Sequence, residues 1–164
     1  MPPSTEAPGA RLRALWRRLA PLPGGRWLFS RLLGRRVPYS GSIGALVEHF
    51  EPGHAIVSVR DRRAVRNHLR SVHAIALANL GELSTGLAVL GAMDASVRGI
   101  LTGLEVSYLR KARGRLTAEA RCSVPKVVEP VDWRVEAAVR DASGAVVAVV
   151  TAAWRLAPVP EAGS

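Results

Sequence analysis

The chain has 164 residues, enough to bury one compact core and too few for two comfortable domains. Hydrophobic residues make up 48% and charged residues 22%, which is typical of a globular chain rather than a disordered one. The net charge of +10 lies mainly in the first 40 residues, which hold eight arginines and one acid. Because the rest of the chain has no basic stripe interleaved with aromatics, composition argues against a nucleic-acid partner.

The sequence predicts a basic helical extension at residues 1–40, of which residues 1–10 are expected to be a disordered tail. Pro21 and Pro23 separate two apolar pieces, and the first has helical spacing with arginines on the opposite face. Residues 11–34 could therefore contact a membrane surface as a basic amphipathic anchor, but we favour a helix pair packed on the domain. The apolar positions are Leu12, Leu15, Trp16, Leu19, Trp27, Leu28, Phe29, Leu32 and Leu33.

The next segment predicts a hairpin and then one long helix. Two strands, at residues 42–51 and 55–60, flank the turn Glu51-Pro52-Gly53. A helix capped by Ser71 runs to about Leu90 and is apolar on nearly every side, so it must be enclosed. Its length makes a membrane span worth weighing, but its polar residues and glycines favour a core helix of a soluble protein.

Alternation of apolar and polar residues then predicts strands at residues 104–108, 116–124 and 132–140. After a turn at residues 141–144, the apolar run at 145–154 predicts a central strand covered on both faces. The expected fold is α+β, an antiparallel sheet wrapped around one long helix in the order β-β-α-β-β-β-β. We therefore expect a single domain at residues 41–157 and a disordered tail at 158–164.

The single cysteine, Cys122, lies on the apolar side of a predicted strand and is expected to be a small core residue. One cysteine cannot form an internal disulfide, which fits a reducing compartment. No continuous apolar stretch near the start has the form of a secretory signal, so we expect a cytoplasmic location. The sequence shows no phosphate-binding glycine loop, no serine elbow and no metal-ligand spacing.

Glu82 is the feature most indicative of function. Between Arg70 and Asp94 it is the only acid in a segment of mostly small or apolar residues, and His73 stands at the entrance. A carboxylate placed alone in so apolar a helix costs free energy unless a function requires it.

The set Asn67, His73 and Glu82, spaced by six and nine residues, resembles the hotdog-fold thioesterase superfamily. The resemblance is strongest to the branch of phenylacetyl-CoA-type and other small acyl-CoA thioesterases, and covers about residues 42–156. It implies a hotdog fold, a homodimer or tetramer, and an acyl-CoA or acyl-carrier thioester as substrate. It implies no metal and no redox cofactor.

Nine residues of helix separate His73 from Glu82 by about 13 Å, too far for both to serve one carbonyl. Two copies with antiparallel central helices would bring Glu82 of one near His73 of the other. Glu82 would attack the thioester or activate water, and Asn67 would hold the water or the carboxylate. His73 would have an orienting role rather than act as the base. The amides of Ala74 and Ile75 would bind the developing oxyanion.

Two features keep alternatives open. The related motif has two glycines where this chain has Ala74 and Ile75, and a bulky Ile75 would crowd the substrate. This favours, as a second hypothesis, a hotdog protein that binds an acyl thioester without cleaving it. Each residue also has a structural interpretation: Asn67 as a turn residue, His73 as a helix-entry residue, and Glu82 as a partner of an arginine across an interface.

A basic turn precedes the strand at residue 116. The resemblance implies that basic residues at this turn meet coenzyme A phosphates. The alternative is a solvated hairpin. The residues are Arg110, Lys111, Arg113 and Arg115.

Overall fold

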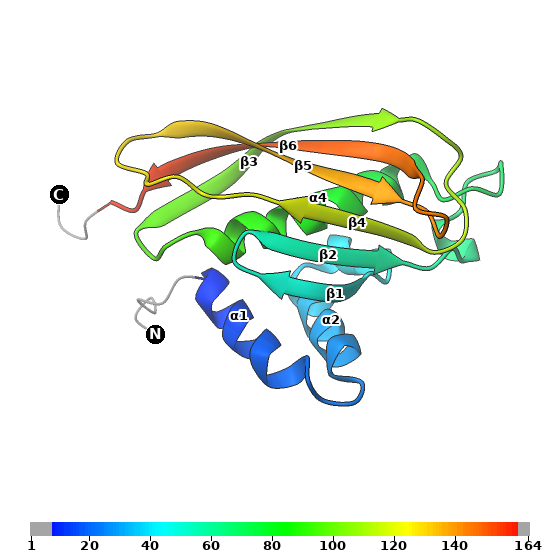
Figure 1. Ribbon diagram of the computed structural model, residues 1–164, viewed down its shortest axis with the longest axis horizontal. Helices are drawn as coiled ribbons and strands as arrows, with labels where there is room; N and C mark the ends of the chain where they lie inside the picture. Colours follow the sequence, from blue (N-terminus) through cyan, green and yellow to red (C-terminus); the bar gives the residue numbers. More distant parts are fainter. Residues whose placement is uncertain (1–7, 161–164) are drawn as a thin grey trace.

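The computed structural model describes residues 8–160 and shows a six-stranded sheet curled around one long helix (Figure 1). The helices are α1 (Pro8–Leu19), α2 (Gly25–Arg36), α3 (Pro38–Ser42), the 3-10 turn η1 (Arg63–Val65) and α4 (Ala74–Ala92). The strands are β1 (Leu46–Glu51), β2 (His54–Val59), β3 (Val97–Tyr108), β4 (Leu116–Arg121), β5 (Val131–Arg140) and β6 (Val146–Pro158). All neighbours are antiparallel, in the order β1-β2-β4-β5-β6-β3, which confirms the predicted architecture.

Helix α4 is the core of the molecule. By length and composition it could cross a membrane, but 67% of its apolar stretch is buried inside the protein, chiefly against the sheet. Its close packing depends on small residues, because a Cβ added at Gly81 would overlap the Val150 side chain on β6. The prediction of an enclosed core helix is confirmed.

The helix begins later than the sequence suggested. His73, rather than Ser71, is the N-cap residue, and its Nδ1 accepts a hydrogen bond of 3.1 Å from the Ile75 amide. The Ser71 amide instead donates to Asn67 Oδ1, and the Ser71 hydroxyl is buried without a hydrogen-bond partner. The predicted Ser71 cap is therefore wrong, because Asn67 folds residues 67–71 into a turn ahead of the helix.

Helices α1 and α2 pack on the outside of β1 and α4 (Figure 1). Their anchors are Trp16 and Phe29, whose rings lie 5.0 Å apart and both contact Phe50 of β1. Burying each large side chain contributes on the order of 1.5–3 kcal/mol. The apolar face of α1 is thus used inside the protein, as expected for a helix pair packed on the domain.

Helix α1 begins at Pro8, inside the segment expected to be a disordered tail. The reason is a close approach: a Cβ at Gly9 would overlap the Leu90 carbonyl oxygen of α4, so the chain is held there by packing. Strand β6 likewise extends to Pro158. The remainder of the two predicted tails, residues 1–7 and 161–164, lies outside the described residues.

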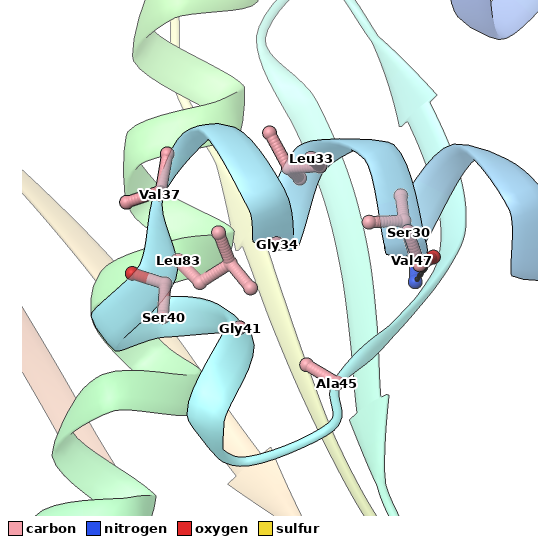
Figure 2. Close-up of a pocket in the computed structure, with 9 residues that line it drawn as sticks. All are labelled: Ser30, Leu33, Gly34, Val37, Ser40, Gly41, Ala45, Val47 and Leu83. Atoms are coloured by element: carbon pink, nitrogen blue, oxygen red, sulfur yellow. Dashed lines mark hydrogen bonds between the residues drawn. The ribbon is translucent and has the colours of Figure 1, made fainter.

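The expected strand at residues 42–51 is shorter than predicted. Pro38 begins the short helix α3, and Gly44, at a φ of 65°, turns the chain before β1 starts at Leu46. Figure 2 shows α3 folded back beside α2, with Leu83 of α4 reaching toward the angle between them. A Cβ at Gly41 would lie 2.6 Å from the Gly34 oxygen, so this approach of the two helices needs glycine.

Strand β3 forms an edge of the sheet and pairs only with β6. A bulge between Leu101 and Gly103 shifts its side chains, which explains why the alternation predicted only the part from Leu104 onward. Strand β6 is internal, as predicted, but its outward residues are half-buried rather than fully covered. Cys122 follows β4 instead of lying in it and is also half-buried.

Candidate functional site

The entrance of α4 is built by the loop that Asn67 closes. Asn67 Oδ1 accepts hydrogen bonds from the amides of Leu69 (2.9 Å) and Ser71 (3.1 Å). This turn also accommodates Arg70 at a φ of 55°, a value that few residues other than glycine adopt. The Asn67 oxygen is thus used in shaping the loop, and only its amide nitrogen is left to meet a ligand.

His73 has a similar local role. Its backbone amide donates to the Val65 carbonyl at 2.8 Å, and its ring accepts the Ile75 amide hydrogen. That amide was expected to face a substrate oxygen, but it is already occupied by the ring. Among the residues described, no acceptor satisfies the amides of Ala74 and Ala76, so these two N–H groups remain for an anion at the helix start.

Glu82 lies two turns further along α4 and is half-buried. Its carboxylate makes no hydrogen bond or ion pair with any described residue. Burial raises the pKa of this carboxyl group above its ordinary value of 4.5. A carboxylate with a raised pKa is a stronger base than an ordinary one, which suits it to taking up a proton from water.

Two residues that the sequence reasoning missed make the surroundings of Glu82. A Cβ placed on Gly86 would lie 3.7 Å from Glu82 Oε1 and 3.9 Å from Cζ2 of Trp154, so both groups border the same small space. Trp154 is on β6, and its buried indole nitrogen has no hydrogen-bond partner in the described part of the chain. Only the fold brings β6 next to this turn of the helix, so no local pattern could have identified Trp154.

A cavity of about 260 Å³ lies beside the α4 entrance, between α3, η1 and the first turns of the helix. His73 and Ile75 line it, and so does Asn79, which is only 7% exposed. The Asn79 side chain donates to the Tyr39 carbonyl at 3.2 Å, and its own oxygen has no partner. The cavity therefore contains a buried hydrogen-bond acceptor. Asn79 was noticeable in the sequence as a polar residue in an apolar helix.

Tyr108 links the edge strand to the helix entrance. Its hydroxyl donates to the Ala74 carbonyl at 3.1 Å, and burial raises the pKa of the phenol. Leu104 and Tyr108 of β3 and Ile75 of α4 are exposed, although all three are large and apolar or aromatic. An apolar strip thus stays uncovered between β3 and α4 in one chain.

Only part of the basic turn lies near the α4 entrance. Arg113 donates to the Leu69 carbonyl at 3.4 Å, which places it on the loop ahead of α4. Arg110 instead lies near Asp141, whose pKa is lowered first by a hydrogen bond from Ser143 and also by the Arg110 charge. Lys111 is exposed. Within residues 8–160, no group of three His, Cys, Asp or Glu side chains could hold a metal ion.

Comparisons with known proteins place this arrangement in a family. The family model "Domain of unknown function (DUF4442)" matches residues 25–156. A comparison with curated proteins found no match. Among solved structures, the genomics protein APC5556 shares 28% identity with a TM-score of 0.80, covering 92% of this chain and 100% of its own.

Two further solved structures are similar to this chain. PA5026 from Pseudomonas aeruginosa, a probable thioesterase of unknown function, shares 24% identity and a TM-score of 0.73, covering 84% of this chain and 97% of its own. A mutant of the phenylacetic acid degradation protein PaaI from Thermus thermophilus shares 20% identity and a TM-score of 0.60, covering 72% of this chain and 97% of its own. The predicted resemblance to hotdog thioesterases is confirmed at the level of the fold, and the chain belongs to the DUF4442 family.

Proposed function

We propose that the protein hydrolyses an acyl thioester, such as an acyl-CoA, at a site shared by two copies of the chain. The observation that carries this proposal is the carboxylate of Glu82, which is half-buried in an apolar helix, has a raised pKa and has no hydrogen-bond or ion-pair partner among residues 8–160. The names of the similar thioesterase structures support the same reaction class.

We infer a dimer from the separation of the two side chains. About 13 Å of helix separates His73 from Glu82, so a single chain cannot place both at one carbonyl. The uncovered strip between β3 and α4 is the surface that a second copy would cover, extending the sheet edge to edge. With the two α4 helices antiparallel, each Glu82 would approach the partner's helix entrance, giving two equivalent sites.

In this site Glu82 acts as a general base. It takes a proton from water while the water oxygen bonds to the thioester carbonyl carbon, and the carbonyl oxygen gains the negative charge. The Ala74 amide at the start of α4 stabilises that oxyanion, helped by the helix dipole. Collapse of the intermediate breaks the carbon–sulfur bond, and the proton held by Glu82 passes to the departing thiolate.

Thiol release from a panel of acyl-CoAs tests the proposal. Glu82→Gln keeps the size of the side chain but cannot accept the proton, so kcat should fall by roughly 100-fold or more. Glu136→Gln is a matched control, since Glu136 is an exposed carboxylate on β5, outside the residues that form the α4 entrance. Equal turnover by the parent and Glu82→Gln would remove the carboxylate from the reaction.

A second function is favoured by the α4 entrance itself. The Ile75 amide is occupied by His73, and the Ile75 side chain is 52% exposed beside the cavity where substrate would approach. A helix start whose Ile75 amide is already occupied would bind an acyl thioester without efficient cleavage. Saturable binding of acyl-CoA with no thiol release would identify this function.

Membrane contact through residues 11–34 has support in one place. Trp27 is 61% exposed, Leu22 and Leu28 are also exposed, and the Arg31 guanidinium lies 5.7 Å from the Trp27 ring centre. Vesicle co-sedimentation of Trp27→Ser against the parent tests this contact. Deletion of residues 1–40 is unsuitable, because it would remove the buried Phe29 from the core. The cytoplasmic location stays a prediction.

A further inference from the structure

A groove of about 770 Å³ runs between α2 and the β1–β2 end of the sheet; Asn67, His73 and Glu82 do not line it, but Arg115 of the basic turn does. Arginines line it from three separate parts of the chain. They are Arg31 and Arg35 on α2, Arg60 and Arg62 after β2, and Arg115 before β4. Its volume is in the range of small-molecule sites, about 300–1,000 Å³.

The positive charge in this groove is poorly compensated. No acidic residue among those described lines it, and the neighbouring carboxylate of Glu48 is engaged by Arg115 and by the Ser58 hydroxyl at 2.6 Å. Arg35 and Arg60 make no hydrogen bond or ion pair with any residue in the described part of the chain. Like charges that line one groove repel one another, so an anionic ligand would relieve the repulsion.

The walls of the groove are fixed by backbone packing. Gly44 leaves room for the Arg62 guanidinium, because a Cβ there would lie 2.9 Å from Arg62 Nη2. The same nitrogen donates to the Ser42 carbonyl at 3.2 Å, which holds Arg62 at the rim. On the other side, the glycine contact between α2 and α3 holds these two helices close together. The groove is therefore formed before any ligand arrives.

We propose that this groove binds the phosphate groups of a phosphorylated ligand that carries at least two negative charges. Phosphate oxygens match the forked guanidinium donors, and a tetrahedral group can meet arginines from two walls at once. Trp27 stands at the mouth, with the Arg31 guanidinium 5.7 Å from its ring centre. An indole at that place would report ligand entry by fluorescence.

Inorganic pyrophosphate is the probe for the test, titrated by calorimetry and followed by intrinsic fluorescence, with Trp27→Phe separating the Trp27 signal from those of the other three tryptophans. Arg35→Gln with Arg60→Gln should weaken binding at least about tenfold, because charge-assisted hydrogen bonds to phosphate are lost. Arg134→Gln with Arg140→Gln on β5 removes the same charge outside the groove and should change affinity less than about twofold. Thermal unfolding of each variant checks that the fold is retained.

A second arm separates a soluble phosphate from a lipid headgroup, using vesicles of phosphatidylcholine with and without phosphatidic acid. Pyrophosphate binding that depends on the groove arginines supports a soluble ligand. Binding only to phosphatidic acid vesicles, with the same dependence, supports a lipid phosphate. Binding to neither probe, or equal losses in the groove and β5 variants, would overturn the proposal. None of these measurements depends on thiol release, so they test the groove independently of the proposed thioesterase activity.

Discussion

The Tyr108 hydroxyl donates a hydrogen bond of 3.1 Å to the Ala74 carbonyl, and so joins the end of the edge strand to the first turn of the core helix. Because the carbonyl belongs to the helix start, the bond helps to fix the entrance where a thioester oxygen would bind. A partner docking on β3 would therefore contact the same structure that orients the substrate.

Removal of this hydroxyl should have a measurable effect. Tyr108→Phe loses one partly exposed hydrogen bond, for which we expect a decrease in the free energy of unfolding of about 0.5–1 kcal/mol. Urea unfolding measures this change. Tyr39→Phe is the control, since only the backbone carbonyl of Tyr39, and not its hydroxyl, makes a hydrogen bond with the described residues. A similar decrease in the free energy of unfolding of both variants would show that the hydrogen bond to Ala74 does not itself stabilise the fold.

Two glycines of α4 should respond in opposite ways to alanine. At Gly86 a Cβ would make ordinary contacts, so Gly86→Ala should stabilise the fold by up to about 1 kcal/mol through helix propensity. At Gly81 a Cβ would overlap Val150, so Gly81→Ala should destabilise it by about 1–3 kcal/mol. Thermal unfolding of the pair decides, and a loss in Gly86→Ala would mean that the space beside Glu82 is tighter than described.

The raised pKa of Glu82 predicts how stability depends on pH. The folded carboxyl group holds its proton more tightly than the unfolded one, so its ionised form costs stability at pH above the folded pKa. That cost is absent below the ordinary value of 4.5, where both states are protonated. Stability contributed by this group therefore falls as pH rises through the raised pKa.

Glu82→Gln should thus be more stable than the parent at about pH 7, with a difference that shrinks toward zero near about pH 4. Denaturant unfolding of both proteins across this range gives the difference, and the carboxyl groups of Asp61 and Glu119 cancel because both proteins retain them. A difference that stays constant with pH would contradict the burial of the charged form. The same titration predicts that thiol release rises with pH through the raised pKa.

The sequence predicted the helices and strands whose side chains repeat with a regular period. It predicted less well the features that depend on contacts between residues far apart in the chain. The apolar surroundings of Glu82 were visible as composition, but Trp154 joins them only through the packing of β6 against α4. The helix α3 was missed because five residues contain too little periodicity, and its position depends on the meeting of Gly34 and Gly41. Asn67 and His73 were identified by spacing, but spacing could not show that the backbone already uses their polar atoms.

The apolar strip on β3 predicts the oligomeric state. Leu104 is exposed on this edge strand, although a leucine there loses contact with any core unless a second chain covers it. We expect the parent to sediment as a dimer or tetramer, and Leu104→Glu to shift toward monomer because a charge would be buried in the interface. Analytical ultracentrifugation over a range of concentrations measures the shift.

Val128→Glu is the matched control for this experiment. Val128 is also an exposed apolar residue, but it lies in the segment between β4 and β5, so the same new charge should leave the association state unchanged. If Leu104→Glu and the parent sediment alike as dimers, the two chains meet elsewhere and the shared site built on β3 and α4 is lost. If the parent is a monomer that still releases thiol, Glu82 and the helix entrance must act within one chain, against the separation of about 13 Å along α4.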